Sequence, residues 1–432
     1  MIVPRDYQQT AIDLGVAYLT DPKQRGRNGL IVAPTGSGKS IVIAGIATRL
    51  DAPTLVFQPS KEILEQNLAK LAHYGYKAAV FSASMGRREI GSITLATIGS
   101  VVRYPEAFAE MRYVLIDECH ALANPKGGQF DEFLSLLPQA RIIGLTATPY
   151  RLASNSFGSQ LRFLTRTRPR IFRDVVHQTP IGWLFDEGYL TPPAYRAVGC
   201  LRPEKLKPNS TGADYTDKSV QQEMFEVGFV GELQAQVERE FDEGRKNCLV
   251  FTRFVEESRR LARVIPGTAV VTAESSPAER AQTIADYRGG RIRCVANVGV
   301  LGIGFDFPEL ESVVLGAPSV SLARYYQQVG RIIRPVYADG ADLSTAAGRR
   351  AAIAAGPKPV AHVVDLVGLT QQFGPVEELT LTPGGATGEQ WAICAGDRPL
   401  TNVYFHQISG VDPVVAQKAA NKRQFWAKRN RR

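Results

Sequence analysis

Short runs of β-branched and other apolar residues alternate with helical patterns through most of this 432-residue chain, and this alternation restricts its fold more than any other feature. The first series of runs is "GLIVAP" (29–34), "TLVFQP" (54–59), "YVLIDEC" (113–119) and "RIIGLTATP" (141–149). The second series is "NCLVFTRF" (247–254), "GTAVVTAES" (267–275), "RIRCVANVGV" (291–300), "SVVLGAP" (312–318) and "AHVVDLVG" (361–368). Runs that are apolar nearly throughout are typical of parallel strands covered by helices on both faces. The pattern therefore predicts an α/β fold with two such sheets in tandem.

The two series predict two domains and a C-terminal extension. We expect the first domain over residues 1–178 and the second over 179–370, with a polar insertion at about 201–225. Residues 371–432 show no further alternation, form the expected extension and end in a basic tail. One helix start is legible, because Ser276, Pro277 and Glu279 supply a cap, a proline at the first helical position and a capping-box glutamate.

Charge and cysteine usage limit the kind of partner and the compartment. The balance of 51 Lys+Arg against 42 Asp+Glu gives a net charge of +9, which favours a polyanionic partner. The first ten residues lack the features of a signal peptide, and no apolar run approaches the ~18 residues that a membrane helix needs. The five cysteines are scattered singly with no CxxC pair. We therefore expect a reducing, cytoplasmic setting, with no membrane, no structural zinc and no disulfide framework.

The segment "APTGSGKS" (33–40) follows an apolar strand and opens the apolar helix "KSIVIAGIATRL". Backbone N–H groups in such a loop cradle phosphates at the helix N-terminus, where the helix dipole also favours an anion. Lys39 would reach the β- and γ-phosphates of ATP, and Ser40 would place its hydroxyl on Mg²⁺. The full pattern has glycine where Ala33 stands, and the alternative is a chance Gly/Ser turn. The residues predicted to hold the nucleotide here are Pro34, Thr35, Gly36, Ser37, Gly38, Lys39 and Ser40.

A nucleotide site of this kind needs carboxylates at a second strand end, and "LIDECH" supplies them. Asp117 would hold Mg²⁺ through water, and Glu118 would orient or deprotonate the attacking water. Without the loop at 33–40, the same pair would be read as a solvated strand end. The next strand ends in Thr146 and Thr148, whose hydroxyls would hydrogen-bond Glu118 and a neighbouring group, although a turn-forming role is the alternative.

The segment "QQVGRIIRP" (327–335) carries two arginines just before a proline. As a helix it would place Gln327, Arg331 and Arg334 at i, i+4 and i+7, on one face, and Pro335 would end it. Two guanidiniums on one face suit a phosphate. We expect Arg331 and Arg334 to reach the γ-phosphate from the second domain and to stabilise the charge that develops in phosphoryl transfer. The alternative is a salt-bridged helix face.

These motifs, in this order and spacing, resemble those of superfamily 2 helicases and translocases over about residues 1–370. The resemblance implies two RecA-like domains with ATP and a nucleic-acid strand bound along their cleft. "RDYQQ" resembles the adenine-reading motif, with Gln8 and Arg5 on the base. "VGVLGIGFDFP" resembles motif V and "QQVGRIIRP" motif VI, which adds Gly304, Asp306 and Gln327 to the expected nucleotide contacts. Motifs Ia, Ib, IV and V imply nucleic-acid contacts at Pro59, Ser60, Lys61, Thr97, Gly99, Ser100, Thr252, Arg253 and Gly302.

Within the superfamily the chain is most similar to the bacterial RadD helicases, relatives of the XPB-like and type III restriction translocases. The similarity rests on "RDYQQ", "GLTATPYRL", "GYLTPPAYR" and the run from "VANVGVLGIGFD" to "QQVGRIIRP". Two departures stand out. The cysteine-rich zinc segment of that group is missing, since residues 371–432 contain only Cys394. Gly302 and Ile303 replace the usual motif V hydroxyls. A short chain of this kind also fits a phage-encoded helicase.

Two basic segments lie outside these motifs. "QLRFLTRTRPRIFRD" (160–174) carries five arginines against Asp174, and is either a phosphate-binding strip or a solvated charge run. The tail "QKAANKRQFWAKRNRR" (417–432) combines seven Lys/Arg with Phe425 and Trp426, and either grips single strands or is a frayed tail. His120 would link the ATP site to the second domain through hydrogen bonds.

The sequence thus predicts an ATP- and Mg²⁺-dependent DNA helicase or translocase acting on single-stranded, duplex or forked DNA in repair, recombination or replication. The alternatives are an RNA helicase, a double-strand translocase, the motor subunit of a restriction or nuclease complex with a protein partner, and an ATP-gated binding switch. No metal-nuclease cluster of carboxylates and lysine stands outside the ATP motifs, so cutting by this chain alone is not expected.

Overall fold

The computed structural model of this protein describes residues 3–73, 75–122, 129–155, 158–209, 214–301, 306–384 and 390–404. The chain forms two compact units. The first comprises the described parts of 3–151, 162–180 and 381–392, and the second those of 152–161, 181–380 and 393–404. Each unit is built on its own sheet, which confirms the predicted α/β class with two tandem parallel sheets.

The sheet of the first unit has eight strands in the order β10-β1-β7-β6-β2-β5-β3-β4. All neighbours are parallel except β3 and β4. The bounds are β1 (Gly29–Val32), β2 (Thr54–Gln58), β3 (Ala79–Ser82), β4 (Arg87–Arg88), β5 (Ile93–Thr97), β6 (Tyr113–Asp117), β7 (Arg141–Thr146) and β10 (Asp174–Gln178). All four predicted strands of the first series are present, whereas β3, β4, β5 and β10 were not predicted.

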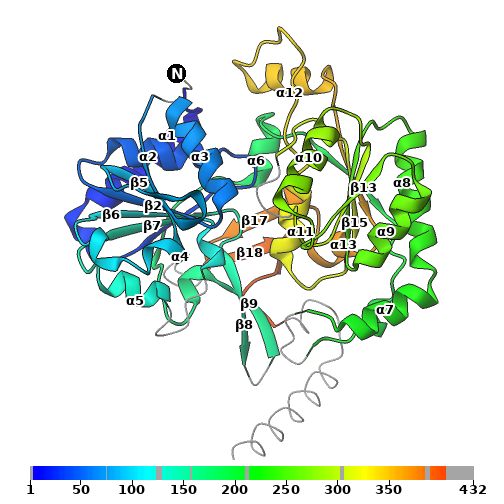
Figure 1. The fold of residues 1–432 in the computed structure, drawn as a ribbon, viewed down its shortest axis with the longest axis horizontal. Helices are drawn as coiled ribbons and strands as arrows, with labels where there is room; N and C mark the ends of the chain where they lie inside the picture. The colour runs from blue at the N-terminus through cyan, green and yellow to red at the C-terminus, as the bar shows by residue number, and fades with distance from the viewer. Residues whose placement is uncertain are drawn as a thin grey trace, which may run out of the picture. The chain divides into compact units, whose positions relative to one another are not determined.

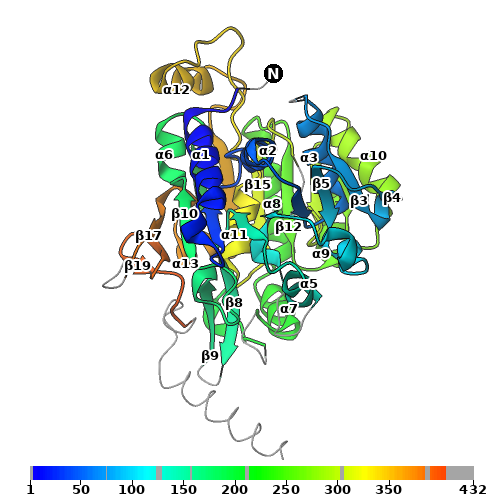
Figure 2. The same ribbon diagram turned by 90° about the vertical axis from the view of Figure 1, so that its left-hand side faces the viewer.

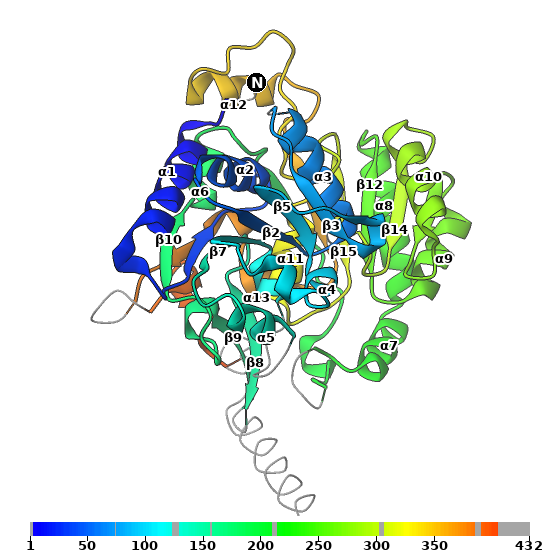
Figure 3. The same cartoon turned by 60° about the vertical axis from the view of Figure 1, so that its left-hand side comes forward.

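Helices cover both faces of this sheet because successive strand residues point to opposite sides. Ile31, Val56 and Leu115 pack into one buried cluster, and Leu30, Leu55 and Val114 into another. Helices lie on the side of the first cluster and on the side of the second, as can be followed in Figure 3. They are α1 (Asp6–Thr20), α2 (Lys39–Arg49) and α3 (Lys61–His73), and then α4 (Ile98–Val101) and α5 (Gln129–Ser135). Short 3₁₀ turns lie at Pro22–Gln24, Ala83–Met85, Pro105–Phe108, Cys119–Ala121 and Leu164–Arg166.

The edge strand β10 lies beside α1, as Figure 2 shows. Its register places Asp174 beside Gly29, the first residue of β1. Gly29 in turn lies beside Ile143 of β7. The amino ends of β10, β1 and β7 therefore meet at one edge of the sheet, and their carboxyl ends at the other.

The sheet of the second unit has six parallel strands in the order β11-β16-β15-β12-β14-β13. The bounds are β11 (Pro193–Ala197), β12 (Cys248–Thr252), β13 (Thr268–Val271), β14 (Cys294–Asn297), β15 (Ser312–Gly316) and β16 (Ala361–Asp365). The five predicted strands of the second series are all present, and β11 was not predicted.

Helices flank this second sheet, with α8 and α9 on one side and α11 on the other in Figure 1. The bounds are α6 (Ile181–Asp186), α7 (Asp217–Glu226), α8 (Phe229–Asp242), α9 (Val255–Val264), α10 (Pro277–Arg288), α11 (Leu322–Val329), α12 (Ala346–Ala354) and α13 (Leu369–Phe373), with 3₁₀ turns at Pro203–Lys205 and Val376–Glu378. The predicted helix start is confirmed, because Ser276 accepts a hydrogen bond from the Glu279 N–H at the beginning of α10.

Two small sheets complete the described chain. One pairs β8 (Tyr150–Asn155) with β9 (Gly158–Phe163), and the other orders β17 (Leu379–Thr382), β18 (Ala392–Ala395) and β19 (Arg398–Pro399). The C-terminal extension thus contains strands that the lack of α/β alternation did not predict. Its basic tail at 417–432 lies outside the described residues. Among the described residues, no helix is both long and apolar enough to cross a membrane.

Candidate active site and nucleic-acid interface

The loop from 33 to 40 connects the carboxyl end of β1 to α2. Gly36 and Gly38 adopt left-handed φ angles of +86° and +81°, which glycine reaches without strain. The Ser37 N–H donates to the Pro34 carbonyl at 3.1 Å and closes the turn, so this amide is already used within the loop. The Ala33 N–H donates to the Thr146 carbonyl at 3.0 Å and continues the β1–β7 ladder. Alanine is therefore accommodated where the full pattern has glycine, because this residue lies in the strand and not in the turn.

Two side chains of α1 support the loop from beneath. Gln8 donates from Nε2 to the Ser37 carbonyl at 2.7 Å, and the Tyr7 hydroxyl donates to the same oxygen at 2.9 Å. The Oε1 atom of Gln8 accepts the Arg5 N–H at 2.9 Å. A Cβ at Gly38 would lie 2.4 Å from Gln8 Nε2, so only glycine fits there. The segment predicted to read adenine and the predicted phosphate loop are thus one packed unit.

The predicted carboxylates lie at the carboxyl end of β6, facing the phosphate loop. Lys39 Nζ is 3.1 Å from Glu118 Oε1, and both side chains are largely buried. Asp117 is 6% exposed and accepts the Asn67 amide at Oδ2, 3.2 Å away. Its Oδ1 accepts the Glu118 N–H at 2.9 Å. Glu118 has a φ of +46°, a left-handed conformation unusual for a residue other than glycine, and it turns the carboxylate toward Lys39.

Burial and the neighbouring charges shift the pKa values of Asp117 and Glu118 in opposite directions. Burial, and then the charge of Glu118, raise the pKa of Asp117. Burial also opposes ionisation of Glu118, but Lys39 and His120 outweigh it and lower the pKa of Glu118. Glu118 is thus the ionised partner of the P-loop lysine.

His120 connects Glu118 to the strand end at Thr146. His120 Nδ1 lies 3.3 Å from Glu118 Oε2 and 2.8 Å from the Thr146 hydroxyl. The Thr148 N–H donates to that hydroxyl at 3.0 Å. The expected hydrogen bond from Thr146 to Glu118 therefore runs through His120 and is not direct. Within the first unit the histidine bridges two strand ends, and its expected link to the second domain stays a prediction.

Three further polar residues belong to this site, and sequence reasoning missed them. Asn67 donates to Gln58 Oε1 at 2.8 Å as well as to Asp117. Lys70 donates to the Ser40 hydroxyl at 3.3 Å, on the oxygen predicted to hold Mg²⁺. The signal was present in the sequence, because Asn67 interrupts an apolar stripe on α3 between Leu64 and Leu71 at helical spacing. A buried amide in such a stripe needs polar partners.

The loops implied as nucleic-acid contacts also follow carboxyl ends of strands in the first sheet. Pro59, Ser60 and Lys61 lie between β2 and α3, and Pro59 and Lys61 are exposed. Ser60 accepts the Ile63 N–H at 3.4 Å and begins α3. The second group is Thr97, the last residue of the neighbouring strand β5, with Gly99 and Ser100 of the short helix α4 that follows it. Ser100 is buried, with its hydroxyl 2.9 Å from both the Ala83 N–H and the Thr97 hydroxyl, so it braces the loop from inside.

The helix predicted over the arginine segment of the second unit is wrong in its extent. α11 ends at Val329, before Arg331 and Arg334, and of the three predicted residues only Gln327 lies on it. After Val329 the backbone leaves the α-helical pattern, because the N–H groups of Arg331 and Ile332 donate to carbonyls three residues back. The carbonyl of Ile333 accepts the Thr191 N–H at 2.8 Å, so this backbone group bonds a distant segment and not a further helical turn. Arg334 forms an ion pair with Asp306 of motif V.

A buried lysine joins the motif V and motif VI segments of the second unit. Lys358 is 2% exposed, and its ammonium donates to the carbonyls of Ile332, at 2.8 Å, and Pro308. Burial lowers its pKa to about 7; Arg334 acts in the same direction, and Glu309 and Glu311 oppose it. Sequence reasoning did not single out this lysine, since an isolated lysine carries no pattern.

The remaining implied contacts lie on or near β12 and β14. The Thr252 hydroxyl is buried, 2.6 Å from that of Ser258. Arg253 forms ion pairs with Asp214 at 2.6 Å and Asp217 at 2.8 Å. Gly302 and Gly304 lie outside the described residues. No group of His, Cys, Asp or Glu side chains within the described ranges is arranged to hold a metal ion by itself.

Two family models match this chain. Residues 1–151 match the model described as the type III restriction enzyme, res subunit, and residues 231–336 match the helicase conserved C-terminal domain. Two solved structures share the fold. They are the ATP-dependent type ISP restriction-modification enzyme LlaBIII bound to DNA (TM-score 0.58, 18% identity, covering 84% of this chain and 27% of that one) and S. cerevisiae Dbp5 bound to RNA and ADP BeF3 (TM-score 0.52, 15% identity, 96% and 94%). The two matches and the shared fold are consistent with a superfamily 2 helicase built on two RecA-like domains.

Proteins with similar sequences bear on the predicted relation to XPB-like proteins. The 51.5 kDa protein of a Lactococcus phage (isolate 7-9) is 23% identical over 71% of this chain and 62% of its own length. The putative DNA 3'-5' helicase Rad25 of Haloarcula marismortui is 24% identical over 77% and 50%, and the DNA 3'-5' translocase XPB2 of Sulfurisphaera tokodaii is 24% identical over 76% and 78%. This chain thus spans between half and two thirds of the first two relatives. The predicted relation to XPB-like and restriction-type proteins is confirmed.

Proposed function

We propose that this protein is an ATP-dependent DNA helicase or translocase that couples ATP hydrolysis to movement along, or unwinding of, DNA in repair, recombination or replication. The observation that carries the proposal is the ion pair between Lys39 and Glu118 beside the buried Asp117. It joins the phosphate loop to the two carboxylates in the arrangement that phosphoryl transfer to water needs.

Bound MgATP supplies the phosphoryl group to be transferred and the cation that shields its charge. Lys39, now paired with Glu118, would hold the β- and γ-phosphates, and Ser40, now bonded by Lys70, would hold Mg²⁺ together with Asp117. Glu118, released from Lys39 but still in contact with His120, then orients and deprotonates the attacking water. The fit of these residues rests on the left-handed Gly36 and Gly38 and on a loop that a Cβ would obstruct.

The second unit supplies the arginines. Arg331 and Arg334 stabilise the charge that develops on the γ-phosphate, and Gln327, Gly304 and Asp306 complete the nucleotide contacts. Arg334, now paired with Asp306, would hold the phosphate in the same manner as Lys39. In each pair the carboxylate holds the cation in position, and a phosphate, which carries more charge, can replace the carboxylate.

DNA is the proposed track because the relatives named as Rad25 and XPB2 are a DNA helicase and a DNA translocase. The loops at 59–61 and 97–100 hold the backbone without reading its sequence, with Thr252, Arg253 and Gly302 on the second unit. The five free cysteines favour action in a reducing, cytoplasmic compartment.

A second candidate is the motor subunit of a restriction complex whose cutting belongs to a partner. The family model over residues 1–151, described as a restriction enzyme subunit, favours it. Purification from its own cell type would recover a nuclease or methyltransferase partner with the chain if this reading were correct.

Strand displacement tests the proposal. Forked DNA with one labelled strand is incubated with MgATP and the wild-type chain, and with Lys39→Ala as the control that removes the phosphate-reaching ammonium. A helicase releases the strand in an ATP-dependent manner, and the control does not. A pure translocase leaves the fork intact but displaces a third strand from a DNA triplex. Release from RNA duplexes alone would replace DNA with RNA as the track, and activity in neither assay would reject the motor.

A further inference from the structure

A segment with four exposed arginines crosses one face of the sheet in the first unit. We call residues 164–173 the strap. At its start the Leu164 N–H donates to the carbonyl of Pro149, which follows the carboxyl end of β7, at 2.8 Å. At its end the Arg173 N–H donates to the carbonyl of Asn28, which precedes β1, also at 2.8 Å. Because β1 and β7 are parallel, the strap runs from the carboxyl edge of the sheet to the amino edge.

Buried residues fix which way the strap faces. Leu164 and Phe172 are each 1% exposed and pack into the second core cluster. The Thr167 hydroxyl donates to the carbonyls of Leu164 and Pro169, at 3.0 and 3.2 Å. With both ends anchored in the core, the guanidiniums are left outside: the exposed residues of the strap are Arg166, Arg168, Arg170 and Arg173.

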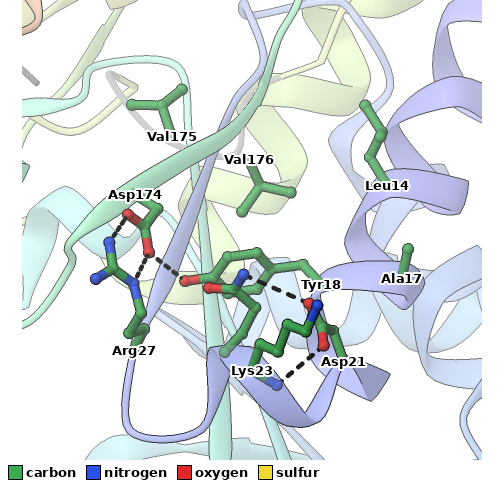
Figure 4. Close-up of a pocket in the computed structure, with 10 residues that line it drawn as sticks. Leu14, Ala17, Tyr18, Asp21, Lys23, Arg27, Asp174, Val175 and Val176 are labelled. Carbon is green, nitrogen blue, oxygen red and sulfur yellow. Dashed lines mark hydrogen bonds and ion pairs between the residues drawn. The ribbon is translucent and has the colours of Figure 1, made fainter. Parts of the chain in front are cut away.

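The positive charge of the strap is not neutralised by the parts of the chain that the structure describes. None of its four exposed arginines forms an ion pair with a described carboxylate; Arg168 and Arg170 donate to carbonyls of the strap itself. The adjacent acid, Asp174, is already occupied. It accepts Arg27 Nε at 2.8 Å and the Tyr18 hydroxyl at 2.6 Å, as Figure 4 shows.

Further cations continue the strap at the amino edge of the sheet. The loop at 22–28 contributes Lys23 and Arg25, since its third cation, Arg27, is paired with Asp174, and the loop at 136–141 contains Arg141 and no acidic residue. Lys23 and Arg27, together with the acidic Asp21 and Asp174, line a hollow of about 610 Å³ between α1 and β10 (Figure 4). The positive charge is confined to this end of the amino edge, because the loops before the more distant strands β2 and β6 contain the acidic residues Asp51 and Glu110.

The chemistry of this surface selects among polyanions. Arginine pairs with phosphate through two parallel hydrogen bonds. Single strands are usually gripped by exposed rings that stack on bases, but the aromatic residues at the strap, Phe163 and Phe172, are 0% and 1% exposed. The strap crosses the sheet along β7, whose six residues span roughly 20 Å at about 3.3 Å each, a little over half of one turn of duplex DNA at about 34 Å. The surface thus suits a continuous phosphate backbone and not unpaired bases.

We propose that the strap, with the loop at 22–28, is a track for the phosphate backbone of duplex DNA, continuing from the carboxyl edge that carries the loops at 59–61 and 97–100. This proposal rests on the proposed function, because it names where that function holds the duplex outside the helicase motifs.

The test compares two variants that each lose four positive charges. The strap variant replaces Arg166, Arg168, Arg170 and Arg173 with Gln. The control variant replaces Arg239, Arg259, Arg260 and Arg263 with Gln; these are exposed arginines of α8 and α9 that already lie within 4 Å of glutamates. Binding of labelled 30-bp duplex and of an unpaired 30-mer is measured from 50 to 300 mM KCl. ATP hydrolysis without DNA confirms that both variants are folded.

For the strap variant we expect duplex Kd to rise more than tenfold and the slope of log K against log salt to fall by about 3.6, roughly 0.9 for each lost contact. The control variant should bind like the wild type. Equal losses in both variants, an unchanged strap variant, or a loss confined to the unpaired strand would overturn the track. If duplex binding depends on the strap but DNA does not stimulate ATP hydrolysis by the wild type, the track stands and the motor is rejected. If DNA stimulates hydrolysis by the wild type but the strap variant binds duplex normally, the motor stands and the track is rejected.

Discussion

Lys358 offers a test of the second unit's energetics that does not depend on catalysis. Its ammonium is 2% exposed and bonds two backbone carbonyls, of Pro308 and Ile332, with no carboxylate within ion-pairing distance in the described structure. Burial lowers the pKa of Lys358 from 10.5 to about 7. One pKa unit is about 1.4 kcal/mol, so the charged form is disfavoured in the folded state by about 5 kcal/mol.

The sign of the pH dependence follows from linkage. Because the pKa of Lys358 is depressed in the folded state, the unfolded chain binds more protons between about pH 7 and 10.5, and stability rises with pH across this window. Below pH 7 the full penalty applies. From pH 7 to 9 the contribution of Lys358 to the free energy of unfolding should rise by about 2 kcal/mol.

Lys358→Met removes the charge but keeps the length of the side chain. Two carbonyls then lose a donor, which costs about 1–3 kcal/mol each and offsets part of the gain at low pH. From pH 7 to 9 the free energy of unfolding of the wild type should therefore rise by about 2 kcal/mol relative to that of the variant. Urea denaturation at pH 6, 7, 8 and 9 measures it, with the exposed Lys246→Met as the control. If the difference in unfolding free energy does not change with pH, the claim that burial lowers the pKa of Lys358 is wrong.

Three further variants test the active site. Glu118→Gln should lower kcat for ATP hydrolysis at least 100-fold without weakening nucleotide binding, since Lys39 loses a competing partner; a filter-binding Kd beside the kcat decides this. Gln8→Ala removes the support of the phosphate loop and should raise KM for ATP about tenfold while reducing the preference for ATP over GTP, measured by competition. Asn67→Ala removes a hydrogen-bond donor from Asp117, and burial and the charge of Glu118 already raise the pKa of this carboxyl group. The acid limb of the pH profile of ATP hydrolysis should therefore move to higher pH, and the free energy of unfolding should fall by about 1–3 kcal/mol. An acid limb that does not move would show that Asp117 does not set it.

The strands that line the nucleotide site, β1, β6 and β7, could be predicted because they are buried on both faces and apolar at nearly every position. β5 was missed although it is buried, because two of its five residues are threonines. β10 was missed because it is an edge strand, only half-buried, and its residues Asp174 to Gln178 mix polar and apolar types. The strands of the C-terminal extension are likewise short and partly exposed. Apolar periodicity reports burial, so elements with little burial leave a weak signal.

In the candidate site, contiguous motifs were readable and long-range partners were not. The phosphate loop and Asp117–Glu118 followed from local pattern and strand ends. The place of His120 between Glu118 and Thr146 required knowing which strands are neighbours. Helical spacing of the arginines suggested a shared face, but the backbone after Val329 bonds three residues back, and the carbonyl of Ile333 bonds Thr191, more than a hundred residues away.

The central claim, that the chain couples ATP to DNA, is tested most directly by steady-state ATP hydrolysis without nucleic acid and with single-stranded, duplex and forked DNA and RNA, for the wild type and Lys39→Ala. The account predicts slow basal hydrolysis, strong stimulation by DNA, and loss of both in the variant. Hydrolysis that is absent, or that is the same with and without every nucleic acid, would contradict it.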